Sequence, residues 1–277
     1  MTEFRETIEA MLPVFIEAAT WRGDVPAWLS VLVSATIWMV GASVASFGGL
    51  FVDRLPGILG LDDEDERGIC FPPSTCDSCG NRIGWMALIP VFGWIIKRGR
   101  CGHCGVAVPS WYPKFEAFLG TGTALIPVMV DDPVEAAVLV GMLWVGTILM
   151  WCDLRYRILP EVLTMPLMFA GLILSPFEPD PWLRSVGAAT AAALVWGTMS
   201  VMSRLRGIDA YSGGDVAIAA AAGAWVGFHG VPSLLLMTCG IFLIYALIMR
   251  KRGVEWIPMG PAFVIAMQIE MIALINP

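Results

Sequence analysis

Long apolar stretches, separated by polar or proline-containing connections, dominate the pattern of this chain. A helix that crosses a membrane needs about 20 mostly apolar residues, and eight stretches approach that length. They are Trp28–Val52, Phe115–Val130, Val134–Cys152, Val162–Phe177, Leu183–Ser203, Val216–Phe228, Ser233–Met249 and Trp256–Asn276. Apart from the connection that follows the first stretch, each connection is short, as between antiparallel neighbours in a helical bundle. The pattern predicts an all-α polytopic membrane protein with about eight transmembrane helices.

The composition agrees with a chain that lies in lipid. Of its 277 residues, 57% are apolar and 15% are charged, and the mean hydropathy is +0.72. A soluble globular domain has about 45–50% apolar and about 25% charged residues. These values exclude a disordered, collagenous or small disulfide-rich protein and argue against an ordinary cytosolic enzyme. The formal net charge of −7 argues against nucleic acid as a partner.

Lysine and arginine are concentrated in alternate connections. Fourteen of the 17 lie in Asp53–Lys114, Asp153–Pro160, Arg204–Gly214 and Arg250–Glu255. The other three, Arg5, Arg22 and Arg184, lie in the N-terminal tail and in the opposite connections. Because cytoplasmic loops of membrane proteins carry the excess of lysine and arginine, the first set is predicted to face the cytoplasm. Both termini are then extracytoplasmic.

This topology divides the chain into four parts. Residues 1–27 carry apolar side chains at helical spacing and several glutamates, so we expect an extracytoplasmic amphipathic segment. Residues 28–52 form the first transmembrane helix, and residues 53–114 form a cytoplasmic insert. Residues 115–277 form a membrane core of seven helices.

The insert holds two Cys-x2-Cys pairs. They are Cys76, Cys79, Cys101 and Cys104. Two such pairs supply four thiolates to one tetrahedral zinc ion, and a segment with little core of its own gains folding energy from the metal. Because a cytoplasmic location disfavours disulfides, the pattern predicts a small domain that binds structural Zn²⁺. His103 is an alternative ligand, although the four-cysteine set is simpler.

Two aspartates lie at the predicted cytoplasmic ends of apolar stretches. Asp153 closes the third stretch and Asp215 opens the sixth, so the topology places both at the same depth on the same membrane face. Ionisable side chains within a membrane are costly and are functional candidates. Gly213 and Gly214, directly before Asp215, let the backbone approach a substrate or partner closely.

A pair of neighbouring carboxyl groups is suited to hydrolysis of a peptide bond. One of the two keeps its proton because both do not ionise easily side by side. The ionised group takes a proton from a bridging water, and the protonated group hydrogen-bonds the scissile carbonyl. The structural alternative is that Asp153 lies beside Arg155 and Arg157 at the membrane surface and that Asp215 is a helix N-cap.

Six motifs in order resemble the type IV prepilin peptidase family, and the resemblance covers the chain from about Ser46. The motifs are Ser46-Phe47 through Arg54-Leu55-Pro56; Ile89-Pro90-Val91 with Trp94, Arg98-Gly99-Arg100-Cys101 and Cys104; Tyr112-Pro113 with Glu116; Asp153-Leu154 with Leu159-Pro160; Gly214-Asp215 with Gly223-Ala224-Trp225; and Pro258 with Gly260-Pro261. Each motif is short, and their order together with the four cysteines makes the resemblance specific.

The resemblance implies a leader peptidase and N-methyltransferase of type IV pili and type II secretion, in the bacterial inner (cytoplasmic) membrane. It implies that Asp153 and Asp215 are the catalytic pair of a GxGD-type intramembrane aspartyl protease. It also implies a prepilin or pseudopilin substrate, whose positively charged leader is cut off and whose new N-terminus is methylated with S-adenosylmethionine. The partners are thus this substrate and membrane lipid. No residue that binds S-adenosylmethionine is identified by the sequence.

The chain departs from the family pattern at four positions. Ser212 replaces the first glycine of GxGD, Ala217 a lysine, Gly49 an asparagine and Ala87 an acidic or amide residue. The replacements in and before the cysteine region bear on methylation more than on cleavage. A rival hypothesis is a catalytically decayed membrane scaffold that docks pilus or secretion components through the zinc insert. A third, a transporter with the aspartates as a proton relay, leaves the cysteine pairs unexplained.

Overall fold

The part of the chain that the structure describes is helical. The computed structural model describes residues 26–61, 68–69, 71–207, 212–253 and 257–275. Its elements are α2 (Ala27–Ile58), the 3-10 helix η1 (Trp85–Leu88), α3 (Phe92–Ile96), α4 (Trp111–Met129), α5 (Pro133–Tyr156), α6 (Glu161–Leu174), α7 (Pro181–Arg206), α8 (Gly213–Lys251) and α9 (Gly260–Ile275). Within the described residues, β-structure is limited to two isolated bridges, Thr75–Arg82 and Arg100–Ala107. The predicted all-helical class is confirmed.

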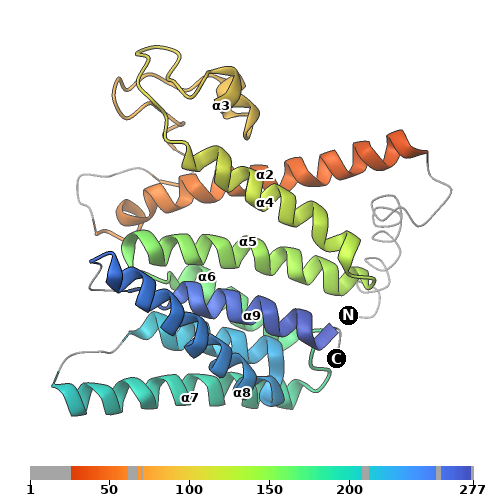
Figure 1. The fold of residues 1–277 in the computed structure, drawn as a ribbon, viewed down its shortest axis with the longest axis vertical. Coiled ribbons are helices and arrows are strands. Elements are labelled where there is room, and N and C mark those ends of the chain that lie inside the picture. Colours follow the sequence, from red (N-terminus) through yellow and green to blue (C-terminus); the bar gives the residue numbers. More distant parts are fainter. Residues whose placement is uncertain (1–25, 62–67, 70, 208–211, 254–256, 276–277) are drawn as a thin grey trace. The chain divides into compact units, whose positions relative to one another are not determined.

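The helices belong to two compact units, Met1–Trp144 and Val145–Pro277. The boundary between the units falls inside α5. Figure 1 shows α2 to α4 of the first unit in orange to yellow-green, and α6 to α9 of the second in green to blue. The predicted amphipathic segment 1–27 lies almost wholly outside the described residues, which begin at residue 26.

Four of the described helices are long and apolar enough to cross a membrane. They are α2, α5, α7 and α8. The helices α6 and α9 are apolar but shorter, and α4, with 19 residues, belongs to neither group. The sequence predicted about eight spans. The numbers differ in part because two of the predicted stretches, Val216–Phe228 and Ser233–Met249, lie on the single long helix α8.

The helix α8 is broken at one residue. Gly227 has φ 71° and ψ 177° and separates residues 213–226 from residues 228–251, and Figure 1 shows α8 changing direction along its length. A Cβ at Gly227 would lie 2.6 Å from the Cγ atom of Glu178, so both the backbone conformation and the space require glycine. The sequence predicted the break at Gly230-Val231-Pro232. This position is wrong: Pro232 lies inside α8, close to the start of the second arm, where a proline displaces few preceding carbonyls.

In the first unit, α2 packs along α4 through small residues. A Cβ at Gly120 of α4 would lie 2.9 Å from the carbonyl oxygen of Trp38 in α2. A Cβ at Gly41 would collide with the side chain of Thr123, whose hydroxyl also accepts a hydrogen bond from Nε1 of Trp144 at 2.8 Å. Close backbone approach at small residues is how helices associate where lipid supplies no hydrophobic driving force.

In the second unit, α8 packs against α6, α7 and α9. A Cβ at Gly187 of α7 would lie 2.6 Å from the carbonyl oxygen of Gly223 in α8. The indole of Trp225 in α8 donates to the carbonyl oxygen of Leu167 in α6 at 2.8 Å. The fully buried side chains of α9 include Ala262, Phe263, Ala266, Met267 and Met271. The first arm of α8 is therefore central to this unit.

A buried arginine closes the turn between α6 and α7. Arg184, 8% exposed, donates to the carbonyl oxygens of Leu172, Ile173, Glu178 and Pro179 at 2.6–3.5 Å. Two of these carbonyls belong to the last turn of α6, where no helical N–H is available to them. The positive charge of Arg184 is thus satisfied inside the protein.

Candidate functional site

The first candidate catalytic residue, Asp153, lies near the end of α5 and is buried. It is 5% exposed, and its Oδ2 atom accepts a hydrogen bond from the backbone N–H of Gly260 at 2.7 Å. Gly260 is the first residue of α9, so the donor is one of the N–H groups that a helix leaves unpaired at its start. Such a group and the helix dipole favour a negative charge on the carboxylate.

Close packing at Gly260 explains why a glycine stands at the start of α9. A Cβ at this position would lie 2.5 Å from Oδ2 and 3.0 Å from Cγ of Asp153. Any side chain at residue 260 would therefore push the carboxyl group away from the helix start. The sequence identified Gly260-Pro261 as part of a motif, but its contact with Asp153 was not predicted.

The second candidate, Asp215, lies in the first turn of α8. Its backbone N–H donates to the side-chain oxygen of Ser212 at 3.4 Å, and Ser212 is the N-cap of the helix. A Cβ at Gly214 would lie 2.9 Å from Cβ of Leu159, whereas a Cβ at Gly213 would meet nothing within 4 Å. Of the two predicted glycines, packing therefore requires Gly214.

The two aspartates belong to the same unit, and an electrostatic interaction links Asp215 to Asp153. The charge of Asp215 acts on that of Asp153, although the two are 62 positions apart in the sequence. The cation of Arg157 also acts on Asp153. The structural alternative for Asp215, a helix N-cap, does not describe it, because Ser212 occupies that position.

A tyrosine missed by the sequence analysis lies near the same carboxyl group. Tyr245, on the second arm of α8, lies within electrostatic range of Asp153. It is one of only four tyrosines in the chain, and it lies within an otherwise apolar stretch. The only feature of the sequence that could have drawn attention to Tyr245 is its hydroxyl group within this apolar stretch.

The four predicted zinc ligands gather in one place. The sulfur atoms of Cys76, Cys79, Cys101 and Cys104 all lie within 4.8 Å of one another. Each pair is part of a tight turn, closed by a bond from Gly80 N–H to the carbonyl of Cys76 at 2.8 Å and by one from Gly105 N–H to that of Cys101 at 3.0 Å. Both glycines have positive φ, 67° and 71°, as expected for such turns.

The donor set suits a tetrahedral zinc ion. Zinc–sulfur bonds of about 2.3 Å place tetrahedral ligand atoms about 3.8 Å apart, and the sulfur atoms of Cys76 and Cys104 are 3.8 Å apart. The backbone N–H groups of Cys104 and His103 lower the pKa of the Cys101 thiol to about 6, which favours the thiolate that binds metal. Burial and the neighbouring cysteines raise the pKa of the Cys104 thiol to about 11, so metal binding at Cys104 has to displace a proton. Among the described residues, the cluster consists of the four cysteines without His103.

Polar contacts join the insert to the helices of the first unit. The buried carboxylate of Glu116 in α4 accepts a hydrogen bond from the backbone N–H of Val91 at 2.6 Å. The hydroxyl of Tyr112 donates to Asp53 of α2 at 2.5 Å. The buried guanidinium of Arg54 donates to the carbonyl oxygens of Gly68, Ile69 and Pro72. The insert is therefore held by α2 at residues 68–72 and by α4 at Val91.

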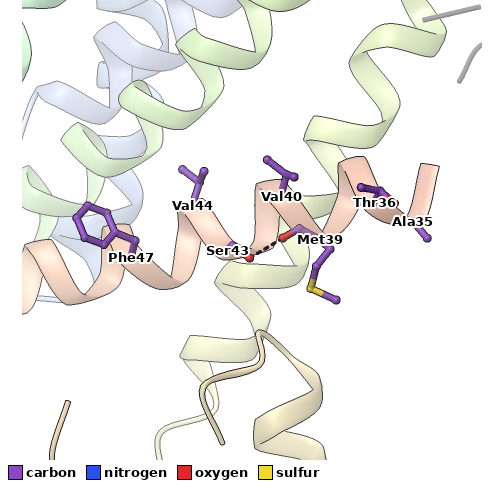
Figure 2. A pocket seen from close by; sticks show the side chains of 7 residues that line it. All are labelled: Ala35, Thr36, Met39, Val40, Ser43, Val44 and Phe47. Atoms are coloured by element: carbon purple, nitrogen blue, oxygen red, sulfur yellow. Dashed lines mark hydrogen bonds between the residues drawn. The ribbon is translucent and has the colours of Figure 1, made fainter. Parts of the chain in front are cut away.

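A hollow on one face of α2 contains no group that could perform hydrolysis. It has a volume of about 640 Å³ and is lined by Ala35, Thr36, Met39, Val40, Ser43, Val44 and Phe47. The hydroxyls of Thr36 and Ser43 donate to the carbonyls of Leu32 and Met39 within the same helix, and Figure 2 shows the bond of Ser43. The hollow therefore presents mainly apolar groups, as expected for a helix face that contacts lipid.

Two family descriptions match this chain. Residues 39–130 match the bacterial peptidase A24 N-terminal domain, and residues 139–247 match the type IV leader peptidase family. The first match covers α4 and the cysteine insert, and the second covers the segments that carry both aspartates. None of the solved structures matches the chain.

Several curated proteins are similar over most of the chain. A prepilin leader peptidase/N-methyltransferase of Klebsiella pneumoniae is 30% identical over 203 residues, which are 73% of this chain and 88% of the relative. The protein of the same name from Burkholderia pseudomallei (strain 1026b) is 29% identical over 241 residues, 85% of this chain and 72% of the relative. That of Aeromonas hydrophila is 28% identical over 263 residues, 85% of this chain and 89% of the relative.

Proposed function

Because this multi-pass membrane chain belongs to the peptidase A24 family of bacterial prepilin leader peptidases/N-methyltransferases, we propose that it cuts prepilins or pseudopilins with Asp153 and Asp215. The substrate is a precursor whose positively charged leader stays at the cytoplasmic membrane face. The observation that carries this proposal is the buried Asp153 carboxylate, which is bound by the start of α9 and lies within the electrostatic influence of Asp215. Ionisable side chains in lipid cost free energy, so a pair of them that is retained there is a candidate for function.

The two carboxyl groups have different roles. Asp153 is the base, because the N–H of Gly260 favours its ionised form. It takes a proton from a water molecule as the water oxygen attacks the scissile carbonyl carbon. Asp215 is protonated and donates a hydrogen bond to the carbonyl oxygen, where negative charge develops. The intermediate collapses when Asp153 returns its proton to the leaving nitrogen, which releases the leader and the mature N-terminus.

The proposal includes eight membrane crossings with both termini outside the cytoplasm. Gly227 divides α8 into two arms, each of which is counted as one crossing, and α2, α4, α5, α6, α7 and α9 supply the others. The distribution of lysine and arginine supports this orientation. The parts are then the N-terminal segment 1–27, the first span 28–52, the insert 53–114 and the core 115–277.

Zinc and S-adenosylmethionine complete the proposal. Zn²⁺ held by the four cysteines stabilises the insert, which the sulfur geometry supports. Methylation of the new N-terminus with S-adenosylmethionine is supported by the names of the relatives, which include N-methyltransferase. The alternative is a scaffold that binds prepilin without cutting it.

The peptidase proposal is tested by co-expression with a prepilin, with leader loss followed by gel shift. We expect Asp153→Asn and Asp215→Asn each to abolish cleavage while the protein still accumulates in the membrane, because each change removes one of the two acid–base groups. Glu161→Gln, an exposed carboxylate at the start of α6, is the matched control and keeps full cleavage. Retained cleavage in either aspartate variant excludes that residue. Prepilin binding without cleavage by the unaltered protein favours the scaffold.

A further inference from the structure

One side of the cysteine insert carries an apolar surface. Its side chains belong to η1 and to α3. They are Trp85, Met86, Leu88, Phe92, Ile95 and Ile96, all exposed. Trp85 is 71% exposed and Ile96 60% exposed, similar to Phe118 on the apolar helix α4 at 58%. A surface in contact with water rarely leaves so many large apolar side chains together.

The folding of the segment leaves these side chains outside. The indole of Trp94 is turned inward and donates to the carbonyl oxygen of Val108 at 3.1 Å. Gly93 packs on η1, where a Cβ would lie 2.8 Å from a backbone oxygen. The inner side of α3 is therefore used for packing within the insert, and its outer side is left for another partner.

The apolar surface lies beside membrane helices of the same unit. The ring of Phe92 lies 6.1 Å from the ring of Trp38 in an edge-to-face arrangement. Trp38 lies well inside α2, a helix long and apolar enough to cross the membrane. The bond from Val91 to Glu116 of α4 holds the same segment, and Val91 adopts a φ of 60°. The segment is therefore held against both α2 and α4.

Positive charge follows directly after α3. Residues 71–115 contain five cations and one carboxylate: Arg82, Lys97, Arg98, Arg100 and Lys114, with Asp77. Lys97, Arg98 and Arg100 are exposed. Large apolar side chains next to exposed lysine and arginine are typical of segments that lie in the membrane interface and bind anionic lipid.

We propose that the apolar surface rests in the interfacial layer of the bilayer, with Lys97, Arg98 and Arg100 at the phosphate groups of anionic phospholipids. The insert then lies on the membrane that its own helices cross. A positively charged prepilin leader is a weaker candidate for this surface, because like charges repel. The inference is independent of the aspartate pair and holds whether or not the chain cleaves prepilin.

The test uses the full chain in lipid nanodiscs of phosphatidylethanolamine and phosphatidylglycerol. An environment-sensitive fluorescent amino acid is incorporated at Ile96 or, as a control, at Asn81, an exposed residue of the first cysteine turn. Quenchers carried by the lipid near its headgroup report insertion, and aqueous iodide reports exposure to water. We expect the probe at Ile96 to be quenched by lipid and protected from iodide, and the probe at Asn81 to show the reverse.

Charge-reversal variants test the lipid preference. Lys97→Glu and Arg98→Glu together should reduce lipid quenching of the Ile96 probe in nanodiscs with phosphatidylglycerol, because each cation at an anionic surface favours binding by about fivefold. The loss should be much smaller in phosphatidylcholine, and Arg82→Glu is the matched control. Equal access of iodide to both probes overturns the proposal. So does protection at Ile96 that begins only when a prepilin is added, which would identify a substrate surface instead.

Discussion

At the scale of single residues, the candidate site depends on one contact between a glycine and a carboxyl group. Asp153 lies in the last turn of α5, Gly260 is the first residue of α9, and the N–H of Gly260 donates to Oδ2 of Asp153. The contact has two parts, a hydrogen bond that stabilises the charge and a missing side chain that allows the approach. Replacing Gly260 by alanine keeps the backbone N–H group but adds the side chain whose absence allows this approach.

We expect Gly260→Ala to lower the rate of prepilin cleavage by about 100-fold, because the added methyl group displaces the Asp153 carboxyl by about 1 Å and catalysis depends steeply on position. The measurement is single-turnover cleavage of a prepilin in detergent. Gly197→Ala in α7 is the control, since a Cβ there meets nothing within 4 Å and alanine is the better helix former. Equal rates for the two variants would remove Gly260 from the site.

The sequence predicted the residue types of this site but not all of its contacts. Asp153 and Asp215 were chosen because a carboxylate in an apolar stretch is unusual, and this signal is visible in one dimension. Their catalytic role remains a prediction. The contribution of Gly260 depends on a contact across 107 positions, and nothing local to a glycine at a helix start indicates such a partner.

At the scale of elements, the direction of the two arms of α8 depends on the break at Gly227. The positive φ of this residue changes the direction of the helix, and the carboxyl side chain of Glu178 fills the space where a Cβ would lie. The first arm carries Asp215 and the second carries Tyr245. The angle at Gly227 therefore determines whether both arms present their polar groups to the same region.

We expect Gly227→Ala to lower the thermal stability of the purified protein, because alanine at positive φ costs about 1 kcal/mol or more and its Cβ also overlaps Glu178. The checks are the melting temperature in mild detergent and the amount of folded protein recovered from membranes. Gly240→Ala, on the same helix but with open space around it, should melt at or above the temperature of the unaltered chain. A Gly227→Ala variant as stable as Gly240→Ala would contradict this account.

The position of this break also shows where sequence patterns lose precision. Pro232 is the strongest local helix breaker in the stretch, so the pattern placed the interruption there. In the structure, the close packing of Gly227 against Glu178 outweighs the preference of proline. The helical class was predictable from the pattern of apolar residues, whereas the turning point was set by a tertiary contact.

At the scale of the whole molecule, two units with different sources of stability share one chain. The second unit is held by helix packing, with glycines at the crossing of α7 and α8. The insert of the first unit has two isolated β-bridges and two short helices, and its tight turns meet at the four sulfur atoms. Such a segment has little buried apolar surface to support it without a metal.

We expect the purified protein to contain about one zinc ion per chain and Cys79→Ser to lose it, because three thiolates bind zinc far less tightly than four. The insert should then be cut faster by protease between residues 71 and 110, while fragments of the second unit stay intact. Metal analysis and limited proteolysis with mass spectrometry are the measurements. Cys239→Ser, an exposed thiol outside the cluster, should keep its zinc. A zinc-free, protease-resistant insert in the unaltered chain would contradict the metal site.

The arginine that closes the turn between α6 and α7 has a consequence for the order of biogenesis. All four carbonyl acceptors of Arg184 precede it in the chain, the earliest only twelve positions back. The turn can therefore close as soon as residue 184 has left the ribosome, before any of α8 has emerged from it. The hairpin of α6 and α7 has then already formed when α8, which carries Asp215, packs against it. The aspartate pair therefore forms late in synthesis.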